Sequence, residues 1–160
     1  PNVMQGYLGQ PERTAEAMHD DWYITGDIAS IDEDGFIQIT DRLARFSKIG
    51  GEMVPHIKIE ETLAAVIGAG EDELRAAVTA VPDPRKGERL VVVHTALEKP
   101  PHQICKELQE AGLPPLWIPS PDSFIQVEQI PILGTGKLDL KALKALAAER
   151  FAPAPVDSPG

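Results

Sequence analysis

Three short segments of the sequence carry residues that could bind a nucleotide or a phosphate group. Asp27 ends the segment WYITGD, and a carboxylate in such a turn can accept hydrogen bonds from two hydroxyls of a ribose. Lys137 follows two glycines in ILGTGKLDL, where a mobile cation could approach a phosphate. Between these segments, TDRLARFSKIGG places cations ahead of Gly50 and Gly51, whose lack of a side chain permits close approach of a ligand. Taken alone, each segment is more typical of an ordinary solvated turn.

The glycine–lysine segment does not match the Walker A phosphate loop. That motif requires a glycine five residues before its second glycine and a serine or threonine directly after its lysine. Pro131 and Leu138 occupy those two positions here. Two interpretations of Lys137 stay open at this point: a solvated lysine in a turn before a helix, or a mobile positive charge that serves a site elsewhere.

Composition limits the classes of protein to consider. The chain has 160 residues, of which 42% are hydrophobic, enough for one domain or a small domain with an appendage. A formal net charge of −10 argues against general binding of nucleic acid or of an anionic membrane. Cys105 is the single cysteine, which we expect to be a buried thiol in a reducing compartment. The four histidines have no ligand-like spacing, so we expect no metal site.

The pattern of apolar residues predicts a small α+β domain that begins at about residue 44. We expect a hairpin, then a helix from Pro55 to the glycines at 68 and 70. Further strands are predicted at 74–83, 89–97 and 123–130, and further helices at 101–112 and 139–150. The segment 151–160 is Pro-rich and polar, which predicts a disordered tail.

Taken in order, WYITGD, DEDGFIQITDR, KIGGE and PILGTGK resemble the closing motifs of the adenylate-forming superfamily. This superfamily includes acyl-CoA synthetases, luciferases and the adenylation domains of nonribosomal peptide synthetases. The resemblance covers the chain from about Asn2 to Arg150. Within the superfamily, RFSKIGGEMV and LPPLWIPSPDSFIQVEQIPILGTGKLDL look most like the acyl-[acyl carrier protein] synthetase part of bifunctional 2-acylglycerophosphoethanolamine acyltransferases.

The resemblance implies how the chain is divided. Residues 1–43 would be the C-terminal end of the large AMP-binding domain. Residues 44–150 would be the mobile C-terminal domain, a hairpin plus a three-stranded sheet with flanking helices, and 151–160 the tail. The family's phosphate loop, its acyl pocket and its Mg²⁺ site lie in the rest of the large domain. We therefore expect this chain to be a fragment that works with that domain in cis and is inactive alone.

The implied reaction has two steps, between which the small domain rotates. A fatty acid and ATP first form an acyl-adenylate, and a phosphopantetheine thiol then takes the acyl group and releases AMP. The expected thiol is that of acyl carrier protein, for reacylation of lysophosphatidylethanolamine, with CoA as the alternative acceptor. A third alternative is a non-catalytic module that docks a carrier protein. The expected location is the cytoplasm, with the full-length protein at the cytoplasmic face of the bacterial inner membrane.

The resemblance also assigns roles to single residues. Asp27 matches the aspartate that binds the ribose hydroxyls of ATP, and Arg42 matches an arginine that contacts the nucleotide. Lys137 matches the lysine of the adenylation step, where its charge would offset the repulsion between two anions. The remaining match is the loop for thioester formation, which consists of Lys48, Gly50 and Gly51.

Two positions depart from the family pattern. Ala44 occupies the hinge position, where many relatives carry aspartate or lysine. Lys58 stands in place of the first glutamate of the motif E-x-E, whose second glutamate is Glu60. Carrier proteins are typically acidic, so docking one would require a local basic patch. The candidates for this patch are Arg42, Arg45 and Lys48.

Overall fold

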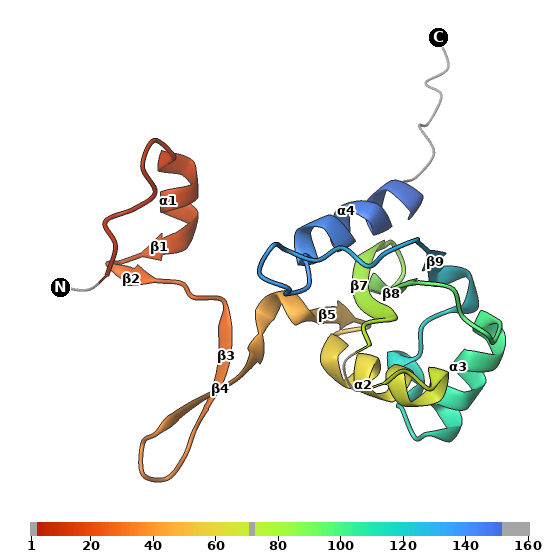
Figure 1. The fold of residues 1–160 in the computed structure, drawn as a ribbon. Coiled ribbons are helices and arrows are strands. Elements are labelled where there is room, and N and C mark those ends of the chain that lie inside the picture. The colour runs from red at the N-terminus through yellow and green to blue at the C-terminus, as the bar shows by residue number, and fades with distance from the viewer. Residues whose placement is uncertain (1–2, 71–72, 152–160) are drawn as a thin grey trace. The chain divides into compact units, whose positions relative to one another are not determined.

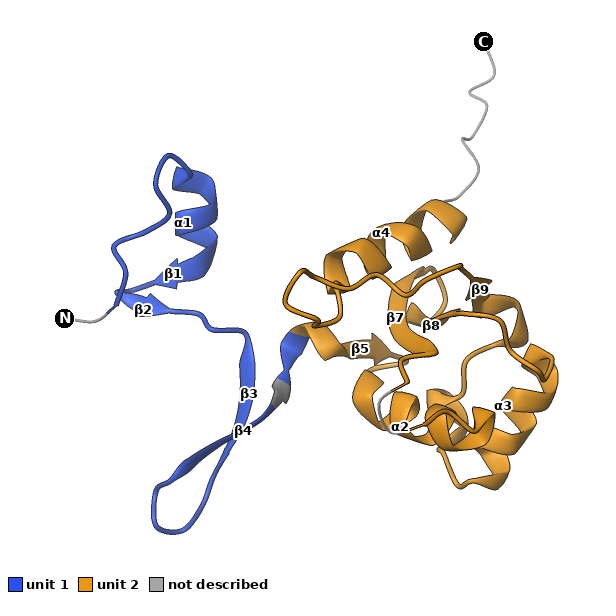
Figure 2. Ribbon diagram, in the orientation of Figure 1, with its two compact units in different colours: residues 1–43 blue, residues 44–160 orange. Residues whose placement is uncertain are grey.

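A computed structural model of the chain describes residues 3–70 and 73–151, with only the backbone of Asp41. The chain divides into two compact units, Pro1–Leu43 and Ala44–Gly160 (Figure 2). Of the predicted tail, residues 152–160 lie outside the described part of the chain. Each unit is described separately below.

Unit 1 contains one short helix and two antiparallel pairs of strands (Figure 1). Helix α1 (Pro11–Ala17) begins at a proline, whose fixed φ suits the first turn of a helix. Strand β1 (Met18–His19) pairs with β2 (Trp22–Tyr23), and β3 (Asp27–Ile31) pairs with β4 (Ile37–Arg42). The turn DEDG closes the second pair, where Asp32 Oδ1 accepts a hydrogen bond from the Phe36 backbone N–H at 2.9 Å.

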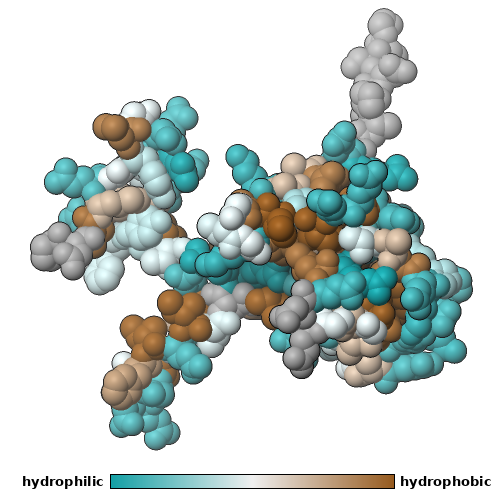
Figure 3. Space-filling view, viewed as in Figure 1, coloured by the Kyte–Doolittle hydropathy of each residue, from teal (hydrophilic) through white to brown (hydrophobic). Residues whose placement is uncertain are grey.

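The hairpin of β3 and β4 exposes large apolar side chains. Ile31, Phe36, Ile37 and Ile39 are all at least 64% exposed, and they form part of the brown surface over this hairpin in Figure 3. An isolated hairpin is at best marginally stable in water. This much exposed apolar surface is typical of a segment that packs against further protein.

Unit 2 is a single five-stranded sheet with helices on both faces (Figure 1). Its strands are β5 (Phe46–Ile49), β6 (Glu52–Pro55), β7 (Ala76–Asp83), β8 (Gly87–His94) and β9 (Phe124–Gln126). The order is β6-β5-β8-β7, all antiparallel, and β9 pairs with β8 in parallel. The helices are α2 (His56–Ile67), α3 (Pro101–Glu110) and α4 (Leu140–Phe151), and the 3-10 turns are η1 (Leu43–Arg45), η2 (Pro115–Trp117) and η3 (Pro121–Ser123).

Strands β7 and β8 are buried on both faces of the sheet. Successive side chains of a strand point to opposite sides, so each strand contributes apolar side chains to both faces. One face packs against α2 and α3, and the other packs against α4. The first face includes Val78, Leu90 and Val92, and the second includes Ala77, Val91 and Val93. Each of these helices therefore covers an apolar face that would otherwise contact water.

The α+β class predicted from the sequence is confirmed, with two differences in detail. The predicted hairpin is not separate from a three-stranded sheet, because Ile49 of β5 pairs with Gly87 of β8 and makes one sheet of five strands. The strand predicted at 123–130 is also shorter, since only Phe124–Gln126 pairs with β8. Residues 128 and 129 bend away from the sheet edge before the next loop.

Two buried polar side chains join β5 to α2. His56 is 3% exposed and Ser47 is 1% exposed, and Nε2 of the histidine lies 2.6 Å from the serine Oγ. Burial is the main cause that lowers the pKa of His56 to about 4, and the nearby charges of Arg45 and Lys144 contribute to the same shift. Because the serine is inaccessible to solvent, this pair is a structural contact rather than a nucleophile with its base.

We expect the free energy of unfolding to fall as the pH is lowered from 6.5 toward 4. Unfolded His56 takes up a proton in this range, whereas the folded state, in which its pKa is about 4, does not. The contribution of this residue to stability is therefore complete above pH 6.5 and is lost on acidification, by roughly 3 kcal/mol in total. When it is measured by urea unfolding between pH 4.5 and 7, the free energy of unfolding should depend more steeply on pH in the parent than in His56→Gln. Equal slopes would contradict a buried neutral histidine.

Candidate functional site

Asp27 and Arg42 lie directly opposite each other in the β3–β4 hairpin of unit 1. The Arg42 Nε atom is 2.8 Å from Asp27 Oδ1, and the carboxylate side chain is only 17% exposed, while that of the arginine is 66% exposed. The Asp27 backbone N–H also donates to Thr25 Oγ1 at 3.1 Å. The hairpin thus brings together two residues that the sequence singled out separately, and it holds a carboxylate in a fixed orientation beside a cation.

Gly50 and Gly51 form the two-residue turn between β5 and β6. Their φ values are +58° and +88°, and the flanking residues Ile49 and Glu52 pair with each other across the hairpin. A two-residue hairpin turn with positive φ at both positions strongly favours glycine. The side chain of Lys48, two residues before the turn, is exposed. We refer to Lys48–Gly51 as the glycine turn.

The tip of the β7–β8 hairpin holds the glycine turn from one side. Glu88 Oε2 accepts a hydrogen bond from the Lys48 backbone N–H at 2.6 Å, and the Gly50 backbone N–H donates to the Lys86 carbonyl at 2.8 Å. A side chain at Gly87 would place its Cβ 3.2 Å from the Lys48 carbonyl oxygen. Glycine at that position therefore permits the two hairpins to approach each other.

Two residues of η2 hold the glycine turn from another side. Trp117 Nε1 donates a hydrogen bond to Glu52 Oε1 at 2.9 Å, and the Leu116 side chain would lie 3.8 Å from a Cβ atom on Gly50. Sequence analysis did not identify these contacts. The tryptophan and glutamate are 65 residues apart, and no local pattern links them.

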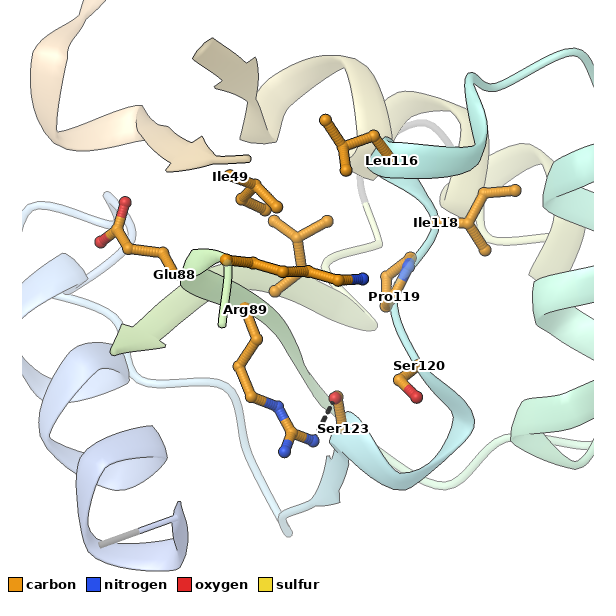
Figure 4. A pocket seen from close by; sticks show the side chains of 10 residues that line it. Ile49, Glu88, Arg89, Leu116, Ile118, Pro119, Ser120 and Ser123 are labelled. Atoms are coloured by element: carbon orange, nitrogen blue, oxygen red, sulfur yellow. Dashed lines mark hydrogen bonds between the residues drawn. The ribbon is translucent and has the colours of Figure 1, made fainter. Parts of the chain in front are cut away.

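A cavity of about 190 Å³ lies beside the glycine turn (Figure 4). Its lining includes the apolar side chains of Ile49 and Leu116 and the cations Lys86 and Arg89. Arg89 Nη2 donates a hydrogen bond to Ser123 Oγ at 2.6 Å, as Figure 4 shows. Glu88 and Ser120 also line the cavity, and Arg89 pairs with Asp122 at 3.2 Å, so the lining carries charges of both signs rather than a purely cationic surface.

Lys137 follows a tight turn that precedes α4. The Gly136 N–H donates to the Leu133 carbonyl at 2.8 Å, and the Leu133 N–H donates to the Lys137 carbonyl at 2.7 Å. Gly136 has a φ of +81°, whereas Gly134 does not lie in the left-handed region. These N–H groups are used within the turn, so they are not arranged as a phosphate cradle. The Lys137 side chain is exposed.

Asp139 fixes this turn to the start of α4. Its Oδ1 accepts a hydrogen bond from the Ala142 backbone N–H at 2.9 Å, which caps the helix, and its own N–H donates to the Pro131 carbonyl at 3.0 Å. The backbone that carries Lys137 is therefore tied down on both sides, while the long side chain extends into solvent.

One of the three candidates for a basic docking patch is engaged inside unit 2. Arg45 is only 12% exposed and makes an ion pair with Glu60 of α2, so it is not available at a docking surface. Arg42 belongs to unit 1 and pairs with Asp27. Of the three candidates, Lys48 is the exposed cation of unit 2.

Three further expectations concern the remaining chemistry of the chain. Cys105 is buried, as predicted; its Sγ lies 3.1 Å from the Pro119 carbonyl, and burial raises the pKa of the thiol. Within residues 3–70 and 73–151, no cluster of three or more His, Cys, Asp or Glu side chains is arranged to hold a metal ion. In the same part of the chain, no helix is both long and apolar enough to cross a membrane.

The structure is similar to solved structures of acyl-activating enzymes. ATP-bound MatB from Rhodopseudomonas palustris matches with a TM-score of 0.70 and 28% identity, over 94% of this chain and 29% of that chain. A fatty acyl CoA synthetase from Mycobacterium tuberculosis matches with a TM-score of 0.61 and 31% identity, over 91% of this chain and 28% of that chain. The α+β fold is that of the C-terminal domain of adenylate-forming enzymes.

Sequence comparison gives the same class of protein, although no family model matches the chain. The long-chain-fatty-acid–CoA ligase of Thermus thermophilus is 36% identical over 148 residues, which is 90% of this chain and 26% of the relative. A feruloyl-CoA synthase of an Amycolatopsis species is 43% identical over 88 residues, 55% of this chain and 17% of the relative. By sequence and by structure, the chain is a relative of the adenylate-forming superfamily, among its acyl- and aryl-CoA ligases.

These relatives qualify the resemblance in two ways. Three CoA ligases match about 90% of this chain, and the match spans about a quarter of the length of each ligase. The relatives are named as CoA ligases, so a particular closeness to acyl-[acyl carrier protein] synthetases is not shown.

Replacing Gly136 by alanine should destabilise unit 2, because a left-handed φ costs a residue with a Cβ atom about 1–2 kcal/mol. Gly134→Ala is the matched control in the same turn, because Gly134 lacks a positive φ. A Cβ atom at either position would have no neighbour within 4 Å, so the two variants differ only in backbone conformation. Urea unfolding should show a loss of about 1 kcal/mol for the first variant and a change within about 0.5 kcal/mol for the second. Equal losses would contradict this account of the turn.

Proposed function

We propose that the chain is the C-terminal portion of an ATP-dependent, AMP-forming acyl-CoA synthetase. The observation that carries the proposal is the 36% identity to a long-chain-fatty-acid–CoA ligase over 90% of the chain. The full-length protein would join a fatty acid to ATP as an acyl-adenylate and then transfer the acyl group to a thiol. The rest of the catalytic machinery, including the Mg²⁺ site, would lie in the large domain that relatives carry ahead of the matching region.

In this proposal the two units have different roles. Unit 1 is the end of the large AMP-binding domain, and the exposed apolar hairpin of β3 and β4 packs against the remainder of that domain. Unit 2 is the mobile domain, which rotates about Ala44 between the two steps of the reaction. The position of the boundary, between Leu43 and Ala44, supports this division.

The adenylation step would use residues from both units. Asp27 accepts hydrogen bonds from the ribose hydroxyls of ATP, and Arg42 orients that carboxylate and contacts the nucleotide. Lys137 brings a positive charge to the α-phosphate as the substrate carboxylate attacks it. Because both reactants are anions, a cation placed at the developing charge lowers the barrier. The exposed side chain of Lys137 on a fixed backbone supports this role.

The thioester step would use the glycine turn. Gly50 and Gly51 leave room for the extended arm of phosphopantetheine, and Lys48 lies beside that path. Each step would thus depend on a different turn of the mobile unit.

CoA is the acceptor that we propose, because the relatives with the strongest similarity are CoA ligases. Acyl carrier protein is the second candidate. Its support is the resemblance of two segments, RFSKIGGEMV and LPPLWIPSPDSFIQVEQIPILGTGKLDL, to acyl-[acyl carrier protein] synthetases. With this acceptor, the enzyme would serve reacylation of lysophosphatidylethanolamine at the cytoplasmic face of the inner membrane.

In the full-length protein, Lys137→Ala should reduce fatty-acid-dependent ATP–pyrophosphate exchange by at least about 100-fold, because it removes charge stabilisation at the α-phosphate. Thioester formation from a supplied acyl-adenylate should change much less. Lys141→Ala is the matched control, because Lys141 is also exposed and lies four residues further along, in α4. The 160-residue chain alone should show no exchange.

Two outcomes of this experiment would contradict the proposal. Unchanged exchange in Lys137→Ala would remove this residue from catalysis. A full-length parent without any exchange would instead favour a non-catalytic module that docks a carrier protein.

The identity of the acceptor can be measured on the same full-length protein. With saturating ATP and fatty acid, CoA should give the higher kcat/KM for thioester formation when compared with phosphopantetheinylated acyl carrier protein. A higher value for the carrier protein would contradict CoA as the acceptor and establish the second candidate. Mass spectrometry of the thioester product would identify the acceptor directly.

A further inference from the structure

The short connection between the two units is anchored on each side of a single residue. Leu43 is tied to unit 1, because its backbone N–H donates to the Gly26 carbonyl at 2.8 Å. Arg45 is tied to unit 2 through its ion pair with Glu60. Ala44 lies between these two anchors, within the 3-10 turn η1.

The anchor on the side of unit 2 is a partly buried polar contact that joins three elements. The Arg45 guanidinium reaches Glu60 Oε2 on α2, and the two side chains are 12% and 17% exposed. The other carboxylate oxygen, Oε1, accepts a hydrogen bond from the Val78 backbone N–H at 2.7 Å. Val78 is fully buried in β7, so Glu60 connects the residue after Ala44 to the outermost strand of the sheet.

Such a contact is stiffer than an ion pair on the surface. Water screens exposed pairs, whereas a partly buried pair with a further hydrogen bond is strongly held in one geometry. The planar guanidinium of arginine fixes direction as well as distance. Two residues further along, the buried contact of Ser47 with His56 also ties β5 to α2. Arg45 and β5 are therefore both fastened to α2 by side-chain contacts.

We propose that Arg45 and Glu60 form a clamp that confines the rotation of unit 2 to the backbone bonds around Ala44. This inference rests on the proposed function, in which unit 2 alternates between two orientations. Without the clamp, the backbone bonds of Arg45, which precedes the paired strand β5, would also turn, and the unit would reach many unproductive orientations. Arg45 and Glu60 are positioning residues in this proposal, since they direct Lys137 and the glycine turn without contacting the substrate.

The clamp can be tested in the full-length protein with spin labels at Glu12→Cys in unit 1 and Lys106→Cys in unit 2, both exposed positions. Glu60→Gln removes the charge but keeps an oxygen to accept the Val78 N–H. We expect this variant to broaden the distribution of label distances, with and without ATP. Both half-reactions should fall by roughly ten- to a hundredfold, because fewer molecules hold the productive geometry. Arg45→Lys keeps the positive charge but loses the planar guanidinium, so its distribution of label distances should be intermediate in width between those of the parent and Glu60→Gln.

Glu61→Gln is the matched control, because Glu61 is the next residue of α2 and pairs with Lys58 on the surface, where the two side chains are 61% and 60% exposed. Its distance distribution and its kinetics should equal those of the parent. A Glu60→Gln distribution as narrow as that of the parent would overturn the proposal, even if stability had fallen. This outcome is distinct from failure of the proposed function, which would appear as a lack of ATP–pyrophosphate exchange in the parent itself.

Discussion

Strands β7 and β8 are apolar on both faces, and the need to bury both faces determines the arrangement of unit 2. Helices α2 and α3 cover one face, so the last helix, α4, covers the other. The position of Lys137 follows from this packing, because Leu143 and Ala147 hold α4 on the sheet and Asp139 caps its first turn. The catalytic role proposed for Lys137 thus depends on apolar side chains that hold α4 on the sheet.

The glycine turn depends on the same sheet in a different way. It lies in the hairpin of β5 and β6, which pairs with β8 through one residue pair, Ile49 with Gly87. Backbone contacts from the β7–β8 tip and side-chain contacts from Trp117 add to this pairing. Small residues are needed on both sides, since the turn requires positive φ and Gly87 permits close approach of a carbonyl. The glycine turn is therefore kept in place by groups around it rather than by side chains of its two glycines.

Much of the fold could be predicted from the sequence, because helices and strands depend on local periodicity. The hairpin that places Asp27 opposite Arg42 was not predicted, although its turn DEDG is a recognisable turn sequence. The contacts that could not be predicted join distant segments. Glu60 lies 15 residues from Arg45, and Glu52 lies 65 residues from Trp117, so no periodicity or turn signal links the partners. The length of β9 likewise depended on which residues reach the edge of β8.

The sequence by itself determined the α+β class, the tight glycine turns and the residues with the right chemistry for a nucleotide and a thiol. Only the tertiary structure decided what each cation does. Arg42 lies beside a carboxylate, Arg45 is buried in an ion pair, and Lys137 extends into solvent. The reason is physical: the behaviour of a charged side chain depends on its burial and on its partner, and both are supplied by segments far away along the chain.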